Sequence, residues 1–234
     1  MPHFLLIVIA LAIAIILHEL AHGVVACWMG DHTARWAGRL TLNPLKHIDR
    51  TGSIMVPLIL AAGQILTLGR IAFLYGWAKP VPVNPVNLRI REYRNPRRLM
   101  AIVAVAGPVT NFLLALAGGF AIHGAEAMQS IRLIDFLAYF IQINLLLGLF
   151  NLIPLPPMDG GRIAVGVLPL PLAIKLAQAE KIGIAAVLLV LFVLPLALAQ
   201  LGIRFDPFRE VMGLVLPAAE HVVLVLTGNG VGNN

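Results

Sequence analysis

Six long apolar runs divide the chain, and their length restricts it to a small set of folds. They occupy residues 4–30, 54–76, 99–122, 133–153, 182–202 and 211–227. A helix of roughly 20 apolar residues crosses the hydrocarbon core of a bilayer, about 30 Å thick, and most of the runs reach that length. Hydrophobic residues make up 59% of the chain and charged residues only 12%, which is not the balance of a soluble domain. The sequence therefore predicts an all-α integral membrane protein, a polytopic helical bundle of about five to six hydrophobic segments.

The run at 54–76 differs from the others because Pro57, Gly63 and Gly69 interrupt it. We expect this segment to re-enter the membrane and return. Re-entry places most of the lysine and arginine residues on one side, as the excess of basic residues in cytoplasmic loops requires. The predicted topology is a multi-pass protein of the cell membrane with its N-terminus outside and its C-terminus in the cytoplasm. The segment 31–53 is predicted to form a small β-like element at the membrane surface.

The whole of 1–234 is expected to be a single membrane-embedded domain. Its core covers about 4–175, further hydrophobic segments lie at about 182–227, and a tail follows at 228–234. The net charge of +6 does not point to nucleic acid as a partner, because the basic residues lie in short loops between apolar runs. The lipid bilayer is the expected surrounding.

Two histidines and a glutamate interrupt the first apolar run, in the order His18-Glu19-Leu20-Ala21-His22. Positions 18 and 22 lie one helical turn apart, so both imidazoles point to one side and can hold a single ion, with Glu19 beside it. Two imidazoles and an open position suit Zn²⁺. If residues 4–29 form one helix, His18 lies roughly 21 Å from its beginning, deep in the bilayer. Ionisable side chains at that depth are costly, so the pattern predicts a metal site.

A catalytic zinc ion usually has three protein ligands, and Asp159 is the candidate for the third. It follows Pro154, Pro156 and Pro157, which cannot continue a helix, and precedes two glycines that permit a sharp turn. An aspartate on such a stiff bend is well placed to reach a metal. It could equally cap the next helix, and the residues alone leave both interpretations open.

Five motifs occur along the chain in a characteristic order. They read HELAHG, GRLTLNPLKHID, GWAKPVPVNP, AGPVTN and FNLIPLPPMDGGR. In this order and spacing the chain resembles the site-2 protease family of intramembrane zinc metalloproteases (peptidase M50-like). It is similar to the compact form of that family, which has no PDZ or CBS domain.

The resemblance implies a function and a set of site residues. His18, His22 and Asp159 would bind one Zn²⁺ ion, and Glu19 would be the general base. The substrates would be transmembrane helical proteins, cleaved within or near their membrane segments by an active site near the cytoplasmic side. Two alternative functions are an ion- or proton-conducting transporter and an inactive relative that binds membrane helices.

Two asparagines are candidates for orienting the substrate or stabilising the oxyanion. Asn151 comes first, because the matching position in the family lies near the active site. Asn111, from the AGPVTN motif, comes second. For each, a hydrogen bond between helices is the alternative role.

Overall fold

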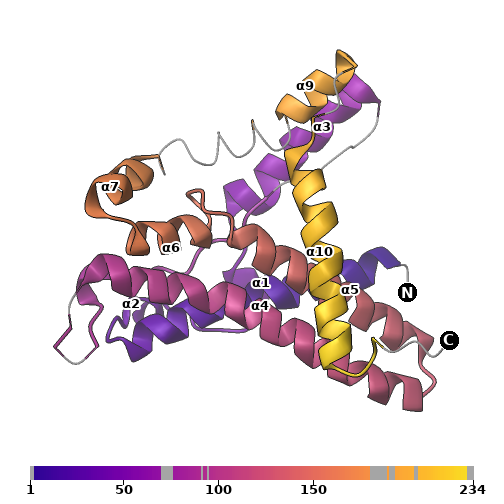
Figure 1. The fold of residues 1–234 in the computed structure, drawn as a ribbon, viewed down its shortest axis with the longest axis horizontal. Helices are drawn as coiled ribbons and strands as arrows, with labels where there is room; N and C mark the ends of the chain where they lie inside the picture. The colour runs from indigo at the N-terminus through magenta and orange to yellow at the C-terminus, as the bar shows by residue number, and fades with distance from the viewer. Residues whose placement is uncertain are drawn as a thin grey trace.

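The computed structural model describes residues 3–69, 76–90, 92, 93, 95–179, 189, 193–202 and 205–230, and this part of the chain is helical (Figure 1). The long helices are α1 (His3–Trp28), α4 (Pro96–Ala127), α5 (Ile131–Asn151) and α10 (Pro207–Leu226). The shorter ones are α2 (Thr33–Trp36), η1 (Pro44–Lys46), η2 (Arg50–Met55), α3 (Val56–Leu68), η3 (Pro85–Asn87), α6 (Asp159–Val167), α7 (Leu170–Gln178) and α9 (Leu194–Gln200). Among the described residues there is no β-strand, only an isolated bridge between Ile90 and Tyr93.

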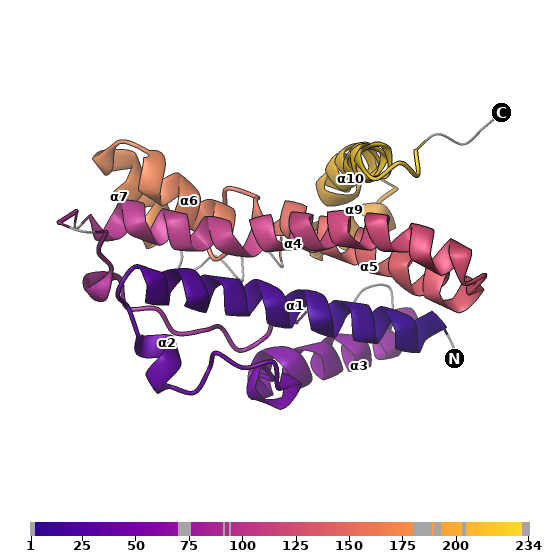
Figure 2. The same cartoon turned by 90° about the horizontal axis from the view of Figure 1, so that it is seen from below.

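Helices α1, α4 and α5 lie side by side at the centre of the molecule (Figure 2). They are 26, 32 and 21 residues long, and each is long and apolar enough to cross a membrane. The described residues thus contain three candidate spans, and the predicted count of five to six is not confirmed. About half of the run at 182–202, namely 182–188 and 190–192, lies outside the described residues.

The three central helices alternate in direction. Hydrogen bonds join Ala14 to Asn111 and His22 to Val103, so α1 and α4 run antiparallel. Helix α5 in turn runs opposite to α4 and parallel to α1 (Figure 1). The end of α1, the start of α4 and the end of α5 therefore meet at one end of the bundle.

Two buried apolar clusters hold these helices together. One joins the end of α1 to the start of α4 and consists of Ala26, Met29, Leu88, Leu99 and Val103. The other joins α4, α5 and α10 and consists of Ala115, Ile141, Leu145 and Val223. Small residues let the helices approach closely, as in other membrane bundles: a Cβ at Gly118 would lie 3.0 Å from the Ile141 side chain.

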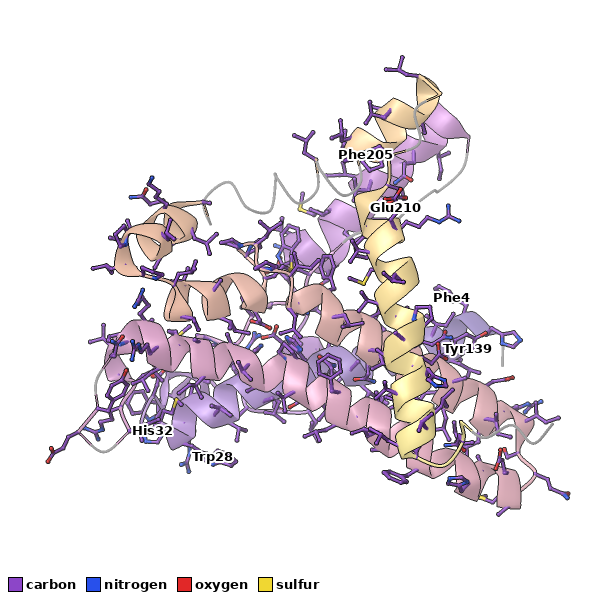
Figure 3. All side chains as sticks on the ribbon, in the orientation of Figure 1. Phe4, Trp28, His32, Tyr139, Phe205 and Glu210 are labelled. Atoms are coloured by element: carbon purple, nitrogen blue, oxygen red, sulfur yellow. The ribbon has the colours of Figure 1, made fainter. Side chains whose placement is uncertain are left out.

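Large apolar side chains also cover the outside. Phe4 is 73% exposed and Trp28 is 82% exposed, near opposite ends of α1 (Figure 3). Lipid tails would cover such side chains, because hydrocarbon solvates them as well as a protein core does. The exposure thus agrees with a membrane protein.

The segment 31–53 does not form the predicted β-like element. It contains α2, η1 and the start of the π-helical η2. The side chain of Asn43 accepts a hydrogen bond from Leu45 N, and that of Asp49 accepts bonds from Thr51 N and Gly52 N. Such local caps compete with an extended strand, and the sequence-based expectation overlooked them. In the run 54–76, α3 ends where Gly69 adopts a φ of 67°, and 70–75 lie outside the described residues.

Helix α10 connects the end of α5 with the end of α4. At the start of α10, Phe208 contacts Phe150 near the end of α5. After its end, Thr227 O accepts a hydrogen bond from His123, near the end of α4. Because α4 is antiparallel to α1, residue 227 lies at the same end of the bundle as the start of α1. The membrane sides of the N-terminus and the C-terminus stay predictions.

Candidate metal centre

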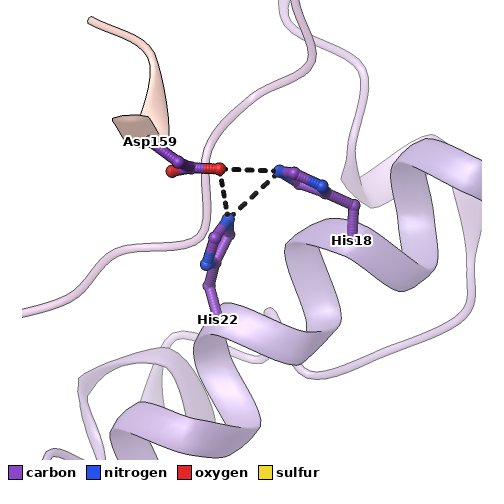
Figure 4. Close-up of side chains that lie close together, drawn as sticks. All are labelled: His18, His22 and Asp159. Atoms are coloured by element: carbon purple, nitrogen blue, oxygen red, sulfur yellow. Dashed lines mark hydrogen bonds and ion pairs between the residues drawn. The ribbon is translucent and has the colours of Figure 1, made fainter. Parts of the chain in front are cut away.

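Two imidazole nitrogens and one carboxylate oxygen converge inside the bundle (Figure 4). The Nε2 atoms of His18 and His22 lie 3.1 Å apart. Asp159 Oδ2 lies 3.1 Å from Nε2 of His18 and 3.2 Å from Nε2 of His22. All three residues are buried. The three atoms thus form a nearly equilateral triangle shielded from solvent.

The side chains come from two elements, α1 and α6, and α6 follows the end of α5 after a short loop. His18 and His22 project from one face of α1, one turn apart. Asp159 is the first residue of α6, where no side chain caps the helix, so its carboxylate is free to face the imidazoles. Gly160 and Gly161 allow this approach: a Cβ on Gly160 would lie 2.3 Å from Leu152 O, and one on Gly161 would lie 2.5 Å from the backbone of Pro156. These glycines are needed for close contact rather than for a left-handed turn, since neither has a positive φ.

The hydrogen bonds behind the rings decide which nitrogens carry protons. His22 Nδ1 lies 2.8 Å from Val103 O, and a carbonyl can only accept, so Nδ1 carries the hydrogen. His18 Nδ1 lies 2.6 Å from Asn111 Oδ1, which is likewise an acceptor. In neutral rings both Nε2 atoms then present lone pairs to each other and to Asp159 Oδ2, which is buried and has no hydrogen-bond donor among the described residues.

Three converging acceptors without a proton between them need a cation. Zinc bonds of about 2.0–2.1 Å in a tetrahedral arrangement place ligand atoms about 3.3 Å apart. The observed separations of 3.1 and 3.2 Å are close to that value. Two nitrogens and one carboxylate oxygen are also a ligand set that zinc accepts. The residues present therefore fit a zinc ion.

Helix α4 leaves room beside the two rings. A Cβ on Gly107 would lie 2.5 Å from His22 Nε2 and 2.6 Å from His18 Nε2, far inside ordinary contact distance. Any larger residue here would push into the space that the three ligand atoms face. Gly107 belongs to the AGPVTN motif, which gave the only signal of this role in the sequence.

A cavity of about 320 Å³ opens onto the triad, and Glu19 lines it. Glu19 Oε2 accepts a hydrogen bond of 2.9 Å from the backbone N–H of Val81. The other lining residues include Trp77, Pro80, Val83, Asn151 and Arg162. Because Val81 holds only Oε2, the other carboxylate oxygen of Glu19 can accept a proton in the cavity.

The segment around Val81 is held in place by two buried charges outside the spanning helices. Arg39 donates a hydrogen bond of 2.7 Å to Lys79 O. Asp31 accepts bonds from Asn84 N, Asn87 Nδ2 and Thr33. Burial opposes ionisation of Asp31, but these hydrogen bonds outweigh it and hold the pKa of the carboxyl below its usual value. The position of the Val81 N–H thus depends on residues well away from the triad.

The predicted asparagines occupy different places. Asn151 lines the cavity, and its Nδ2 donates to Leu147 O within its own helix. Asn111 is fully buried behind His18, does not line the cavity, and also donates to Asn144. The structure thus brings His18, Glu19, His22, Asp159 and Asn151 together around one cavity, with Asn111 behind the ring of a candidate ligand.

A triad of side chains that fits a zinc ion, with a glutamate beside it and helices of membrane length around it, is the arrangement of a metal-dependent hydrolase site in a membrane protein. Comparison with known proteins agrees. Peptidase family M50 matches residues 115–195, a range that contains Asp159. The chain is 44% identical over 197 residues to YwhC of Bacillus subtilis, with 81% of each chain covered. The chain belongs to this peptidase family, that of the site-2 proteases, and is a zinc metalloprotease.

With more distant relatives, the aligned region covers a smaller share of both proteins. Rip2 of Mycolicibacterium smegmatis is 32% identical over 160 residues, which are 67% of this chain and 55% of that protein. Rip3 of Mycobacterium tuberculosis is 41% identical over 73 residues, 31% of this chain and 18% of its own. The names of YwhC, Rip2 and Rip3 each provisionally call the protein a zinc metalloprotease. No solved structure matches the chain significantly.

Proposed function

We propose that the protein hydrolyses peptide bonds within or near the transmembrane segments of other membrane proteins. The observation that carries this proposal is the position of the cavity. It contains His18, Glu19 and His22 of α1, a helix long and apolar enough to span the bilayer. Taking α1 at about 1.5 Å per residue, His18 lies roughly 22 Å from its beginning and 15 Å from its end, hence inside the hydrocarbon.

His18, His22 and Asp159 are the proposed ligands of one zinc ion. When bound, zinc lowers the pKa of a water molecule towards neutrality and polarises the scissile carbonyl. Glu19 accepts the proton that this water loses and later returns a proton to the leaving amine. The Val81 N–H holds one oxygen of Glu19 and so keeps the other directed into the cavity. Asn151, on the cavity wall, is the proposed donor that orients the substrate carbonyl.

The substrate has to present an extended backbone to this site. A transmembrane helix satisfies its backbone hydrogen bonds internally, so it must unwind locally before a peptide bond can reach Glu19. We therefore expect substrates whose membrane segments contain helix-weakening residues such as glycine or proline to be cleaved faster than all-leucine segments.

The antiparallel packing of α1 and α4 supports re-entry of the segment 54–76. Residues 29–95 leave the bundle at the end of α1 and come back at the same end. A single full crossing in between would have made the two helices parallel. Arg97 and Arg98, at the start of α4, lie at this end, and basic residues favour the cytoplasmic side. We accordingly place the N-terminus outside and the catalytic end of the bundle near the cytoplasm.

A Glu19→Gln variant tests the proposal. The purified protein is reconstituted in vesicles with a panel of single-span membrane proteins, and cleavage and zinc content are measured together. We expect zinc to remain at about one per chain while cleavage is lost. The matched control is Glu126→Gln, which changes an exposed acid on α4 and should cleave normally. Cleavage by the Glu19→Gln variant would remove Glu19 as the base, and cleavage restricted to soluble peptides would refute the intramembrane site.

A further inference from the structure

We propose that Asn144 is a positioning residue for the metal site and that it acts through Asn111 to set the orientation and the protonated nitrogen of His18. The proposal rests on the zinc-binding role proposed above for His18. A chain of hydrogen bonds carries it, running from α5 through α4 to α1.

The series of hydrogen bonds begins at a backbone carbonyl, which can only accept. Asn144 Nδ2 lies 2.8 Å from Phe140 O, one turn earlier in α5. A backbone carbonyl has no hydrogen to give, so the amide of Asn144 must turn its nitrogen towards Phe140. Its oxygen, Oδ1, is therefore the atom that faces α4.

The orientation of Asn144 then fixes that of Asn111. Asn144 Oδ1 lies 2.9 Å from Asn111 Nδ2, which donates to it. The same Nδ2 also points to a second carbonyl, Ala14 O, at 3.5 Å. Both neighbours accept, so Asn111 can present only its oxygen to His18.

The oxygen of Asn111 leaves His18 a single neutral form. Asn111 Oδ1 lies 2.6 Å from His18 Nδ1, so that nitrogen carries the hydrogen. Nε2 then has a free lone pair directed towards His22 Nε2 and Asp159 Oδ2. A metal ligand must be deprotonated, and this chain prepares the ring for that role before any ion arrives.

Burial makes the chain rigid. Asn111 and Asn144 are both 0% exposed, so no bulk water can replace a lost partner. Reversing either amide would bring two acceptors together in the bundle interior, where an unsatisfied polar group costs about 1–3 kcal/mol. His22 has no such dependence, because its Nδ1 donates directly to the backbone carbonyl of Val103. The two histidines are thus held by different means. A series of side-chain hydrogen bonds holds His18, and a backbone carbonyl holds His22.

The first measurement needs only the unaltered sequence. The zinc-free protein is labelled with ¹⁵N at histidine, and the tautomer of each ring is read by NMR at pH about 8, above the usual pKa of histidine. The His18 signals are assigned by their loss in a His18→Gln variant. We expect Nδ1 of His18 to be protonated, because it donates to Asn111 Oδ1. An unprotonated Nδ1 would overturn the proposal whether or not any variant folds.

The second measurement is zinc affinity in three variants and a control. Asn111→Leu should weaken zinc binding by about 10- to 100-fold, the loss typical when a ligand's supporting partner is removed. Asn144→Leu should weaken it too, and the double variant should be no worse than Asn111→Leu alone. Gln142→Leu is the control, because this exposed amide on the same helix bonds to Glu220 rather than to α4.

The outcomes separate this proposal from the proposed function. Additive losses in the double variant, or wild-type zinc affinity in Asn144→Leu, would refute the relay even if Glu19→Gln loses cleavage as expected. Cleavage by Glu19→Gln, with the non-additive zinc losses intact, would refute only the assignment of the base. If Asn144→Leu lowers stability but leaves the His18 tautomer unchanged, Asn144 only holds α5 in place, and the relay is refuted.

Discussion

Substituting Gly107 with alanine should destroy the metal site while leaving the bundle folded. The added Cβ would lie 2.5 Å from His18 Cε1 and from His22 Nε2, whereas ordinary contact begins at 3.4 Å. The rings would have to withdraw by 3.4 − 2.5 = 0.9 Å. Metal–ligand distances tolerate only about ±0.2 Å, so the required shift is several times too large. The rings cannot swing aside freely either, because each is held at Nδ1 by α4 itself.

The assay is zinc per chain in protein purified in detergent, together with cleavage of a membrane substrate. We expect both to fall to near zero in Gly107→Ala. The control is Gly124→Ala on the same helix, where a Cβ would meet nothing within 4 Å. That variant should keep its zinc and gain about 0.5–1 kcal/mol of stability, since alanine loses less backbone entropy than glycine in a helix. A Gly107→Ala protein that still binds about one zinc with unchanged affinity would refute the argument from space.

Three further predictions concern the residues around the site. Asp159→Asn should weaken zinc binding by more than the roughly 10- to 100-fold loss typical of a changed supporting partner, and unchanged zinc content would remove Asp159 from the ligand set. Arg39→Met should leave zinc bound but lower kcat by about 10- to 100-fold, because the backbone that holds Glu19 loses its anchor; the exposed Arg35→Met is the control, and equal effects of both would contradict the reasoning. Asp31→Asn should destabilise the protein at neutral pH. The pKa of Asp31 is lowered by folding, so its contribution is present above its unfolded pKa of about 3.9 and is lost as the pH falls through the folded value. The difference in thermal stability between wild type and this variant should therefore shrink in acid, and a difference independent of pH would count against the role of the charge.

The sequence predicted those parts of the site that depend on local spacing. His18 and His22 lie one turn apart on a helix whatever the tertiary structure, so their common direction followed from the pattern alone. The prolines before Asp159 predicted where α5 stops, and the helix does end at Asn151. The family resemblance then supplied the link between two segments more than a hundred residues apart, which no local pattern could give.

Other features depend on packing and could not be predicted from the sequence. Helix α4 is apolar and rich in small residues on all sides, so nothing in it showed whether Asn111 faces the cavity or a neighbouring ring. The segment 31–53 contains strand-forming threonine and leucine, but asparagine and aspartate caps turned it into short helical pieces.

Helix α4 brings together the features of the site that spacing could not reveal. Val103, Gly107 and Asn111 are separated by four residues each and therefore lie on one face of α4, against α1. Val103 supplies the acceptor for His22, Asn111 supplies the acceptor for His18, and Gly107 between them leaves the space into which both Nε2 atoms point. The two histidines of α1 match this face because they have the same spacing, in the opposite chain direction. The proposed ligands lie on α1 and α6, and α4 holds the two imidazoles in place. Changes on this face of α4 should therefore alter zinc binding even though none of its residues is a proposed ligand.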